Sequence, residues 1–383
     1  MPGLARPLAT YLRDERLLPI AARVEAGERL SFEDGLLLYE TPDLTGVGAM
    51  AHHVRLKKHG LKTYFVQNRR LSYTNICYTH CQFCAFQAKP GDPRAYVLSA
   101  DDIVSELAKP ENVGVRELHM VAGHYPKLKI DYFEDLFRRI KERFPGLHLK
   151  VFTMVELGYY ARVSGLSVED FLDRCVAAGL ESCPGGGAEI FDAEIREAIC
   201  VGKKDAQVWL DNAAICHARG IPTNCTMLYG HIEAPKHKVD HLLRLRDLQD
   251  RSLAGGKASF LAYIPLAYQV ENNELSRTHV IHETTGTADL REIAVARLLL
   301  DNIPHIKAYW VMIGEGLAQV GLNYGANDLD GTLIEEEIAH DAGAMTPQML
   351  SKAQLVRLIR EAGFEALERD NLYNTFTLEP ADA

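Results

Sequence analysis

The chain has 383 residues, of which 47% are hydrophobic and 25% are charged, the balance of a globular protein rather than a disordered or fibrous one. Its 52 acidic and 42 basic residues give a net charge of −10. We therefore expect neither nucleic acid nor a membrane surface as a partner, since both select clustered Lys and Arg. No apolar run approaches a membrane span, and Arg6, Arg13 and Arg16 are untypical of a cleaved signal peptide. We expect a cytoplasmic protein whose eight cysteines serve chemistry or burial rather than disulfides.

The first part of the chain, residues 1–58, is predicted to form a charged helical cap. From about residue 72, short β-rich runs alternate with amphipathic helices, which is typical of βαβ units around a parallel sheet. The expected strands are Tyr73–Cys77, Leu118–Ala122, Leu149–Thr153, a short one near Ser182, Asn224–Tyr229, Ser259–Ile264, Lys307–Ile313 and one ending near Asn323–Ala326.

Strands that are each followed by a helix favour a closed (β/α)8 barrel of the TIM type over an open doubly wound sheet. The absence of a GxGxxG or a GxxxxGK[ST] loop agrees with this choice. The sequence thus predicts an α/β protein with a barrel over residues 59–331 and a helical C-terminal extension over residues 332–383.

Three cysteines, Cys77, Cys81 and Cys84, are spaced as Cx3Cx2C directly after the first expected strand. This position is the loop that a barrel presents at its catalytic face. Thiolates are the usual ligands of iron–sulfur clusters, and four irons with three local cysteines leave one iron open to a further ligand.

Structural zinc is the alternative reading of this motif. Zinc closes its shell with four Cys or His ligands, usually in two separated pairs, and the chain has no second CxxC. His80 is the one nearby candidate for a fourth ligand, but a single short loop would then have to supply every vertex. The motif therefore favours a cluster over zinc.

With the aromatic Phe83 before its last cysteine, the motif resembles the CxxxCxΦC signature of the radical S-adenosylmethionine (SAM) superfamily. The resemblance implies a 4Fe–4S cluster held by Cys77, Cys81 and Cys84. It also implies that SAM binds the open iron and that one electron splits SAM into methionine and a 5′-deoxyadenosyl radical.

Further features of that superfamily can be placed along the chain. Ala122 and Gly123 stand where the second strand ends in a turn that receives the SAM amino group, although His124 replaces the usual acid. Residues 226–233 resemble the fifth-strand pattern near adenine, and Glu189 resembles the residue that binds the ribose hydroxyls. The implied SAM-binding residues are Phe83, Ala122, Gly123, Glu189, Arg196, Lys203, Leu228 and Glu233. Two simpler readings stay open, since residues 185–187 suit a tight turn and Glu233 suits a helix start.

Residues 62–365 resemble the menaquinone and deazaflavin branch of the superfamily, and most closely the aminofutalosine synthases of menaquinone biosynthesis. The matching stretches are residues 73–77, 83–86, 185–191, 227–233, 307–316 and 325–332, while residues 124–126 and 69–70 depart from the pattern. The resemblance implies a transferase that adds the 5′-deoxyadenosyl radical to 3-[(1-carboxyvinyl)oxy]benzoate. Aryl migration and decarboxylation then give 6-amino-6-deoxyfutalosine, with SAM consumed as a co-substrate. The implied partners are this aryl enol-ether dicarboxylate and a reductant such as flavodoxin or ferredoxin.

The catalytic residues are not determined by the sequence, because barrel strands are buried on both faces and alternation does not reveal which side chains point inward. The candidates near strand ends are His119, His124, His231, Tyr263, Tyr268 and Asn327, with Asn224 and Trp310 as further contacts. Two other functions stay open. One is a sister reaction of the branch, that of cyclic dehypoxanthine futalosine synthase or of a deazaflavin synthase subunit. The other is a non-catalytic iron–sulfur electron carrier, which normally closes its cluster with a fourth cysteine.

Overall fold

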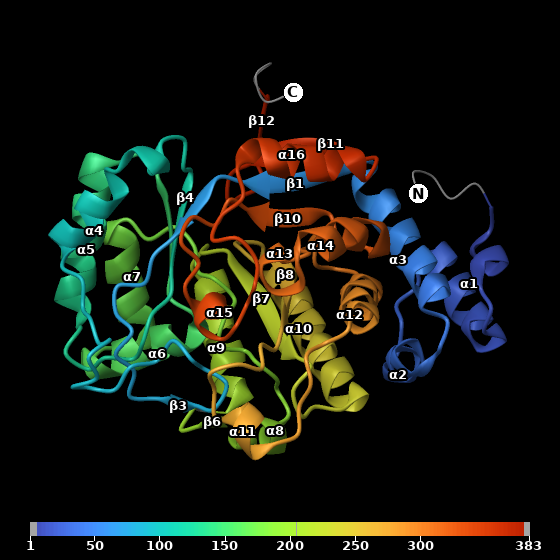
Figure 1. The fold of residues 1–383 in the computed structure, drawn as a ribbon, viewed down its shortest axis with the longest axis horizontal. Coiled ribbons are helices and arrows are strands. Elements are labelled where there is room, and N and C mark those ends of the chain that lie inside the picture. Colours follow the sequence, from blue (N-terminus) through green and yellow to red (C-terminus); the bar gives the residue numbers. More distant parts are fainter. Residues whose placement is uncertain (1–5, 204, 379–383) are drawn as a thin grey trace.

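The computed structural model describes residues 6–203 and 205–378, and its centre is a ring of parallel strands (Figure 1). Strands β1 and β2 follow each other with only Gln67 between them, so they act as one bent strand. The ring then continues in chain order, and β10 pairs with β1 to close it. Its members are β1 (Lys62–Val66), β2 (Asn68–Arg70), β4 (Glu117–Met120), β5 (His148–Val151), β7 (Thr223–Tyr229), β8 (Phe260–Ala267), β9 (His305–Ile306) and β10 (Asp328–Gly331).

Three parallel bridges complete the ring where regular pairing is interrupted. Lys150 pairs with Ser182, Cys183 pairs with Thr223, and Lys307 pairs with Asp328. The short segment at Ser182 therefore stands in the fourth place of the ring, between β5 and β7. The expected closed α/β barrel is confirmed.

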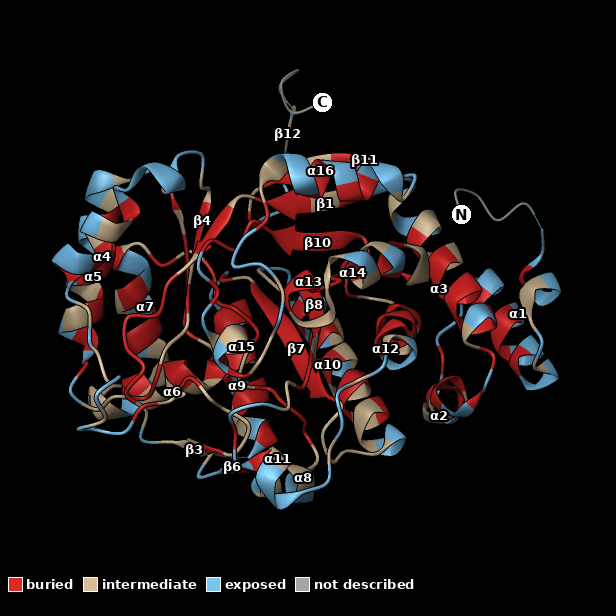
Figure 2. Ribbon diagram, viewed as in Figure 1, coloured by how far each residue is buried: buried red, intermediate tan, exposed pale blue. Residues whose placement is uncertain are grey.

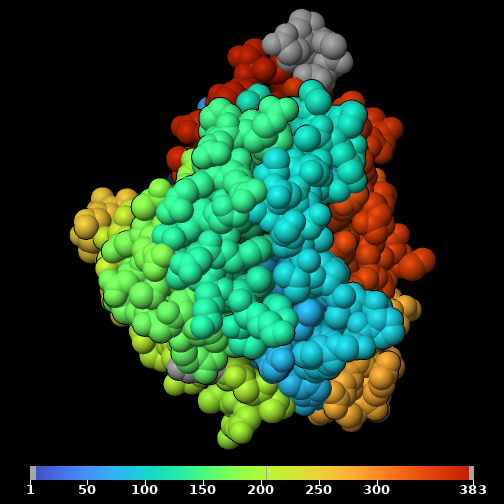
Figure 3. All heavy atoms as spheres, turned by 90° about the vertical axis from the view of Figure 1, so that its left-hand side faces the viewer, coloured from blue at the N-terminus to red at the C-terminus, as the bar shows by residue number. Residues whose placement is uncertain are grey.

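Helices surround the ring and bury their apolar faces against it. Helix α5 shows why, because Phe133, Leu136, Phe137 and Ile140 recur at helical spacing and are all buried. The buried residues gather on the strands and on the inner helix faces (Figure 2), and the helices between residues 100 and 180 form one continuous outer wall (Figure 3). The helices are α4 (Ala100–Leu107), α5 (Ile130–Arg143), α6 (Met154–Val163), α7 (Val168–Ala178), α8 (Ala193–Ile199), α9 (Ala206–Ala218), α10 (Pro235–Gly255), α11 (Leu275–Thr278), α12 (Gly286–Leu299), α13 (Trp310–Ile313) and α14 (Glu315–Gly321).

The N-terminal part is helical, as expected, and it covers helices α10 and α12 of the barrel. Its helices are α1 (Leu18–Ala26), α2 (Phe32–Glu40) and α3 (Leu44–His59), of which α2 and α3 pack on α12. Helix α12 is consequently buried on nearly all sides, which accounts for its apolar run from Ile293 to Leu299. Among the residues that the structure describes, no helix is long and apolar enough to cross a membrane.

The C-terminal extension contains the expected helices, α15 (Ile338–Asp341) and α16 (Lys352–Glu361), and also two strands, β11 (Glu365–Arg369) and β12 (Thr375–Phe376). Strand β11 pairs in parallel with β1. The chain then turns under the ring, where the Tyr373 ring stacks on His305 with 3.4 Å between centroids and its hydroxyl donates to Asp328 at 2.7 Å. This C-terminal plug closes the end of the barrel at which the strands begin.

Three of the expected strands are wrong. Residues 73–77 form a loop with isolated bridges only, and the first strand lies earlier, at residues 62–70. Residues 307–313 leave the sheet after Lys307 and become helix α13, while the last strand begins at Asp328, beyond Gly325 with its φ of 111°. Residues 308–313 are an apolar run, and periodicity does not separate such a run from a short helix. The other two segments contain the loop-favouring residues Asn75, Asn323 and Gly325.

Candidate active site

The loop that carries the three cysteines follows β2 and is held by backbone hydrogen bonds. Strand β3 (His80–Cys81) pairs antiparallel with β6 (Cys200–Val201), so that Cys81 faces Cys200. The Cys77 amide donates to Ala88 O at 3.0 Å, and the Cys84 amide donates to Cys81 O at 3.1 Å. The loop therefore has a defined conformation around its three sulfurs.

All three cysteines line one cavity and are free thiols. Burial raises the pKa of Cys77, and it raises the pKa of Cys84 to about 12. The pKa of Cys81 is lowered, chiefly by a hydrogen bond with Cys200 and also by the charge of Lys203. Metal binding must therefore displace protons from Cys77 and Cys84, as is usual when thiols become ligands.

The arrangement fits a cluster better than a single ion. Within residues 6–203 and 205–378, no three Cys, His, Asp or Glu side chains converge as ligands of one metal ion would. In a 4Fe–4S cluster each thiolate binds a different iron, so the sulfurs surround the cluster without meeting at a point. His80 pairs with Glu274 at 2.9 Å and does not line the cavity, which removes it as a fourth ligand.

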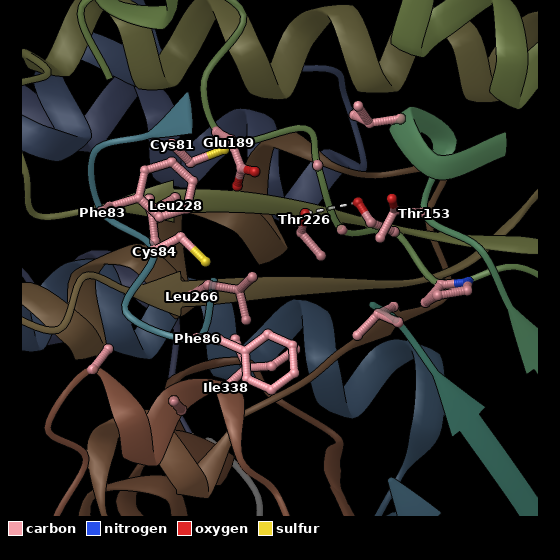
Figure 4. Close-up of a pocket in the computed structure, with 18 of the residues that line it drawn as sticks. Cys81, Phe83, Cys84, Phe86, Thr153, Glu189, Thr226, Leu228, Leu266 and Ile338 are labelled. Atoms are coloured by element: carbon pink, nitrogen blue, oxygen red, sulfur yellow. Dashed lines mark hydrogen bonds between the residues drawn. The ribbon is translucent and has the colours of Figure 1, made fainter. Parts of the chain in front are cut away.

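The cavity has a volume of about 270 Å³ and lies at the end of the ring where the strands finish. Figure 4 shows two sides of it. Cys81, Phe83, Cys84, Glu189 and Leu228 lie together on one side, and the apolar side chains Phe86, Leu266 and Ile338 lie on the other. One side thus offers sulfur and a carboxylate, while the other offers a surface for an apolar ligand.

The carboxylate on the first side belongs to Glu189, at the end of a glycine-rich turn. Gly185 approaches β7 so closely that a Cβ there would lie 2.6 Å from the backbone of Asn224. Glu189 has a φ of 48°, in the left-handed region, and Arg196 holds the turn by donating to the Gly187 carbonyl at 3.0 Å. The Glu189 carboxylate accepts a hydrogen bond from Lys203 at 2.5 Å, so Glu189 lines the cavity as one partner of an ion pair.

The turn after β4 approaches the cysteine loop from the opposite direction. The Gly123 amide donates to Thr74 O at 2.9 Å, and the Ala122 amide donates to the buried carboxylate of Glu156 at 2.9 Å. Burial raises the pKa of Glu156 and is the largest effect on it. Hydrogen bonds with Thr153, Ala122 and Tyr73 lower this pKa but do not outweigh burial. The turn and the cysteine loop are therefore fixed relative to each other.

The structure brings together most of the residues predicted from the sequence. Those that line the cavity are Phe83, Ala122, Gly123, Glu189, Lys203, Leu228, His119, His124 and Tyr268, in addition to the three cysteines. His124 stacks on Tyr159 and hydrogen bonds with Thr79; burial lowers its pKa to about 3, so that it is neutral. That these residues bind SAM or substrate stays a prediction.

Five predicted residues lie elsewhere, and each has a structural contact. Arg196 holds the turn before Glu189, and Glu233 accepts from the amides of Gly230 and His231 at 2.7 and 2.9 Å. The His231 ring contacts the Leu228 carbonyl instead of the cavity. Tyr263 is fully buried inside the barrel wall, and Asn327 lies before its strand, where it binds Arg297 at 2.6 Å. Asn224 and Trp310 likewise do not line the cavity.

Other cavity residues were missed by sequence reasoning. They come from segments that are distant along the chain: Arg70, Phe86, Thr153, Thr226, Tyr309, Asp330, Glu336 and Ile338. Thr226 donates to Gly185 O at 2.8 Å, and Thr153 caps α6. Phe86, Thr226, Tyr309 and Asp330 lie in stretches that resemble the family, and Arg70 lies in one that departs from it. Neither signal placed these side chains at the site.

Comparisons with known proteins agree with this geometry. Residues 71–246 match the Radical SAM superfamily, and residues 257–381 match the CofH/MqnC C-terminal region. An aminodeoxyfutalosine synthase of Thermus thermophilus is 48% identical over 94% of this chain and 96% of its own length, and one of Streptomyces coelicolor is 43% identical over 92% of each. The maturase HydG of Carboxydothermus hydrogenoformans has the same fold, with a TM-score of 0.71 and 15% identity over 94% of this chain and 81% of HydG. The chain belongs to the radical SAM superfamily and, within it, to the group with the CofH/MqnC C-terminal region.

Proposed function

We propose that this enzyme adds the 5′-deoxyadenosyl group of SAM to 3-[(1-carboxyvinyl)oxy]benzoate in menaquinone biosynthesis. The new carbon–carbon bond forms at the enol-ether double bond, the aryl group migrates, and carbon dioxide leaves to give 6-amino-6-deoxyfutalosine. One observation carries the proposal: a single cavity joins the three cysteines and the Glu189 carboxylate to an apolar wall on which an aromatic ring can pack. The names of the relatives at 48% and 43% identity support the same reaction.

The resident cofactor of the family is a 4Fe–4S cluster, which supplies the electron that cleaves SAM. Cys77, Cys81 and Cys84 would hold this cluster. The Glu189 carboxylate would accept hydrogen bonds from the ribose hydroxyls of SAM, since a carboxylate offers two acceptor oxygens to a diol. The backbone of Ala122 and Gly123 would face the amino group of SAM. The hydrogen bond between this turn and the cysteine loop fixes the position of that backbone.

The apolar wall has two tasks in this reaction. It holds the aryl group of the substrate against the ribose side of the cavity, so that the reacting carbons meet in van der Waals contact. It also excludes water from a reactive radical. Phe86, Leu266, Ile338 and Met312 supply this wall.

We further propose that the electron comes from flavodoxin or ferredoxin and that the enzyme works in the cytoplasm. All eight cysteines are free and six of them are buried, which suits a reducing compartment. A low-potential one-electron carrier matches a cofactor that accepts electrons singly.

The test is anaerobic reconstitution of the full chain with iron and sulfide, followed by reaction with SAM, dithionite and the enol ether. Mass spectrometry should show a product that retains the adenosine atoms of SAM. Release of free 5′-deoxyadenosine with consumption of dehypoxanthine futalosine would show the sister reaction instead. An iron–sulfur protein that leaves SAM intact would be an electron carrier, and the proposal would be wrong.

A further inference from the structure

One part of the cavity is lined by polar residues that the proposed chemistry does not yet use. Arg70, at the end of β2, stands beside His119 of β4, since the two are direct partners in the parallel pairing. Arg70 Nη1 donates to the Tyr309 hydroxyl at 2.6 Å and to Glu336 at 2.8 Å. All four residues line the cavity. These contacts join three strand ends and the C-terminal extension in one polar cluster.

The cluster presents several hydrogen-bond donors without acceptors. Arg70 uses only Nη1 in its bonds, so Nη2 and Nε have no partner among the residues that the structure describes. The Tyr309 hydroxyl accepts from Arg70 and donates its own hydrogen to none of the described groups. His119 Nε2 is buried and likewise has no partner within residues 6–203 and 205–378. Buried polar groups are nearly always paired, so the unpaired His119 Nε2, beside the unused Nη2 and Nε of Arg70, indicates a ligand in this part of the cavity.

The two carboxylates that line the cavity beside the cluster each have a cationic partner other than Arg70. Glu336 is shared between Arg70 and His340, whose Nδ1 lies 3.5 Å from the second carboxylate oxygen. The hydrogen bond with Glu336 raises the pKa of His340 to about 9, so His340 is charged at neutral pH. The other carboxylate that lines this part, Asp330, is matched by Lys307 at 3.1 Å. Neither carboxylate thus depends on Arg70 alone, and Nη2 and Nε of Arg70 stay available to an anionic ligand.

We infer that Arg70, Tyr309 and His119 form a subsite for a carboxylate that is attached to an aromatic ring. The identity of the ligand, but not the subsite itself, rests on the proposed function. A carboxylate fits because the planar guanidinium can donate two parallel hydrogen bonds to its oxygens. An aromatic attachment fits because the adjoining wall is apolar, with Leu333, Ile338 and Met312. The benzoate end of the enol ether is such a group. Arg70 would thus orient the substrate and make the enzyme bind acids more tightly than their neutral analogues.

Binding to the cluster-free protein tests this subsite without requiring turnover. The probes are the enol ether, its analogue with a carboxamide in place of the benzoate carboxylate, and 3-hydroxybenzoate, each titrated by calorimetry under anaerobic conditions. Wild type should prefer each acid, and Arg70→Gln should weaken acid binding about 10- to 100-fold while leaving the amide unchanged. Arg70→Gln leaves the buried Glu336 carboxylate without its guanidinium partner, so the double variant Arg70→Gln/Glu336→Gln is measured as well. Tyr309→Phe, which removes a single hydroxyl, should weaken acid binding about 3- to 10-fold.

Arg69 provides a matched control on the same strand. Its side chain is fully buried, but it pairs with Glu106 and Glu335 and does not line the cavity. Arg69→Gln should lower thermal stability without changing the preference for the acid over the amide.

Three outcomes decide the inference. An unchanged preference in folded Arg70→Gln/Glu336→Gln protein would overturn the subsite while leaving the proposed function standing. If 3-hydroxybenzoate binds through Arg70 and the enol ether does not bind, the subsite stands and the proposed substrate is wrong. Failure of wild type to bind either acid would overturn both.

Discussion

Gly123→Ala is expected to displace the cysteine loop, although residue 123 lies outside that loop. A Cβ at position 123 would lie 2.2 Å from the carbonyl oxygen of Ile76 and 2.7 Å from its carbonyl carbon. Ordinary contact between carbon and a carbonyl oxygen needs about 3.3 Å, so the two segments must separate by about 1 Å. Both sides of the contact are backbone, and no side-chain rotation relieves it. Since Ile76 directly precedes Cys77, the displacement falls on a proposed cluster ligand.

The change should cost about 1–3 kcal/mol of unfolding free energy, as overpacking usually does. It should also slow SAM cleavage about 100-fold, the effect of a 1 Å misplacement at a reacting centre. The assays are urea unfolding, iron content after reconstitution, and the methionine released from SAM, measured by chromatography. Gly146→Ala is the control, since a Cβ there meets nothing within 4 Å. Gly123→Ala protein with full iron content and wild-type cleavage would refute the argument.

Three further predictions concern other parts of the molecule. Cys84→Ala should abolish SAM cleavage and lower the iron content of reconstituted protein while changing the melting temperature little; a variant that still cleaves SAM would contradict the cluster assignment. The pKa of His340 is raised to about 9 by its hydrogen bond with Glu336, so its stabilisation is complete below about pH 6.5 and is lost as the pH rises through 9. Wild type should lose up to about 2 kcal/mol more than His340→Asn between pH 6.5 and 9.5 in urea unfolding, and parallel curves would exclude this linkage. Tyr373→Phe removes the hydroxyl that donates to Asp328 and should cost about 1.5 kcal/mol in the same assay; an unchanged midpoint would show that this contact does not stabilise the barrel.

The parts of the site that could be predicted from the sequence are those fixed by local spacing. The three cysteines lie within one loop, and the glycine turn lies directly before Glu189, so each group is assembled by neighbours in the chain. Gly123 was predicted from its resemblance to the superfamily turn after the second strand, and the structure adds the reason for a glycine, since a Cβ there would lie 2.2 Å from the Ile76 carbonyl oxygen. The barrel followed from the alternation of strands and helices.

What the sequence did not reveal depends on contacts between distant segments. Arg70 and Glu336 are 266 positions apart, and neither residue type marks a cavity by itself. His231 was expected at the site because it ends a strand, but its ring turns back to the Leu228 carbonyl. Asn327 precedes its strand instead of following it, and so it lies at the opposite end of the barrel. The direction of a side chain in a strand buried on both faces is set by packing, which periodicity does not encode.

The pairing of β11 with β1 has a consequence for synthesis on the ribosome. Cys84 emerges long before Glu365, the first residue of β11, and at about 5–20 residues per second the interval is on the order of 15–60 s. During that time β1 lacks its partner β11, and the C-terminal plug does not yet close the end of the barrel at which the strands begin. The two ends of the barrel are therefore completed by segments made at different times, and a slow codon stretch ahead of β11 would lengthen the interval between them.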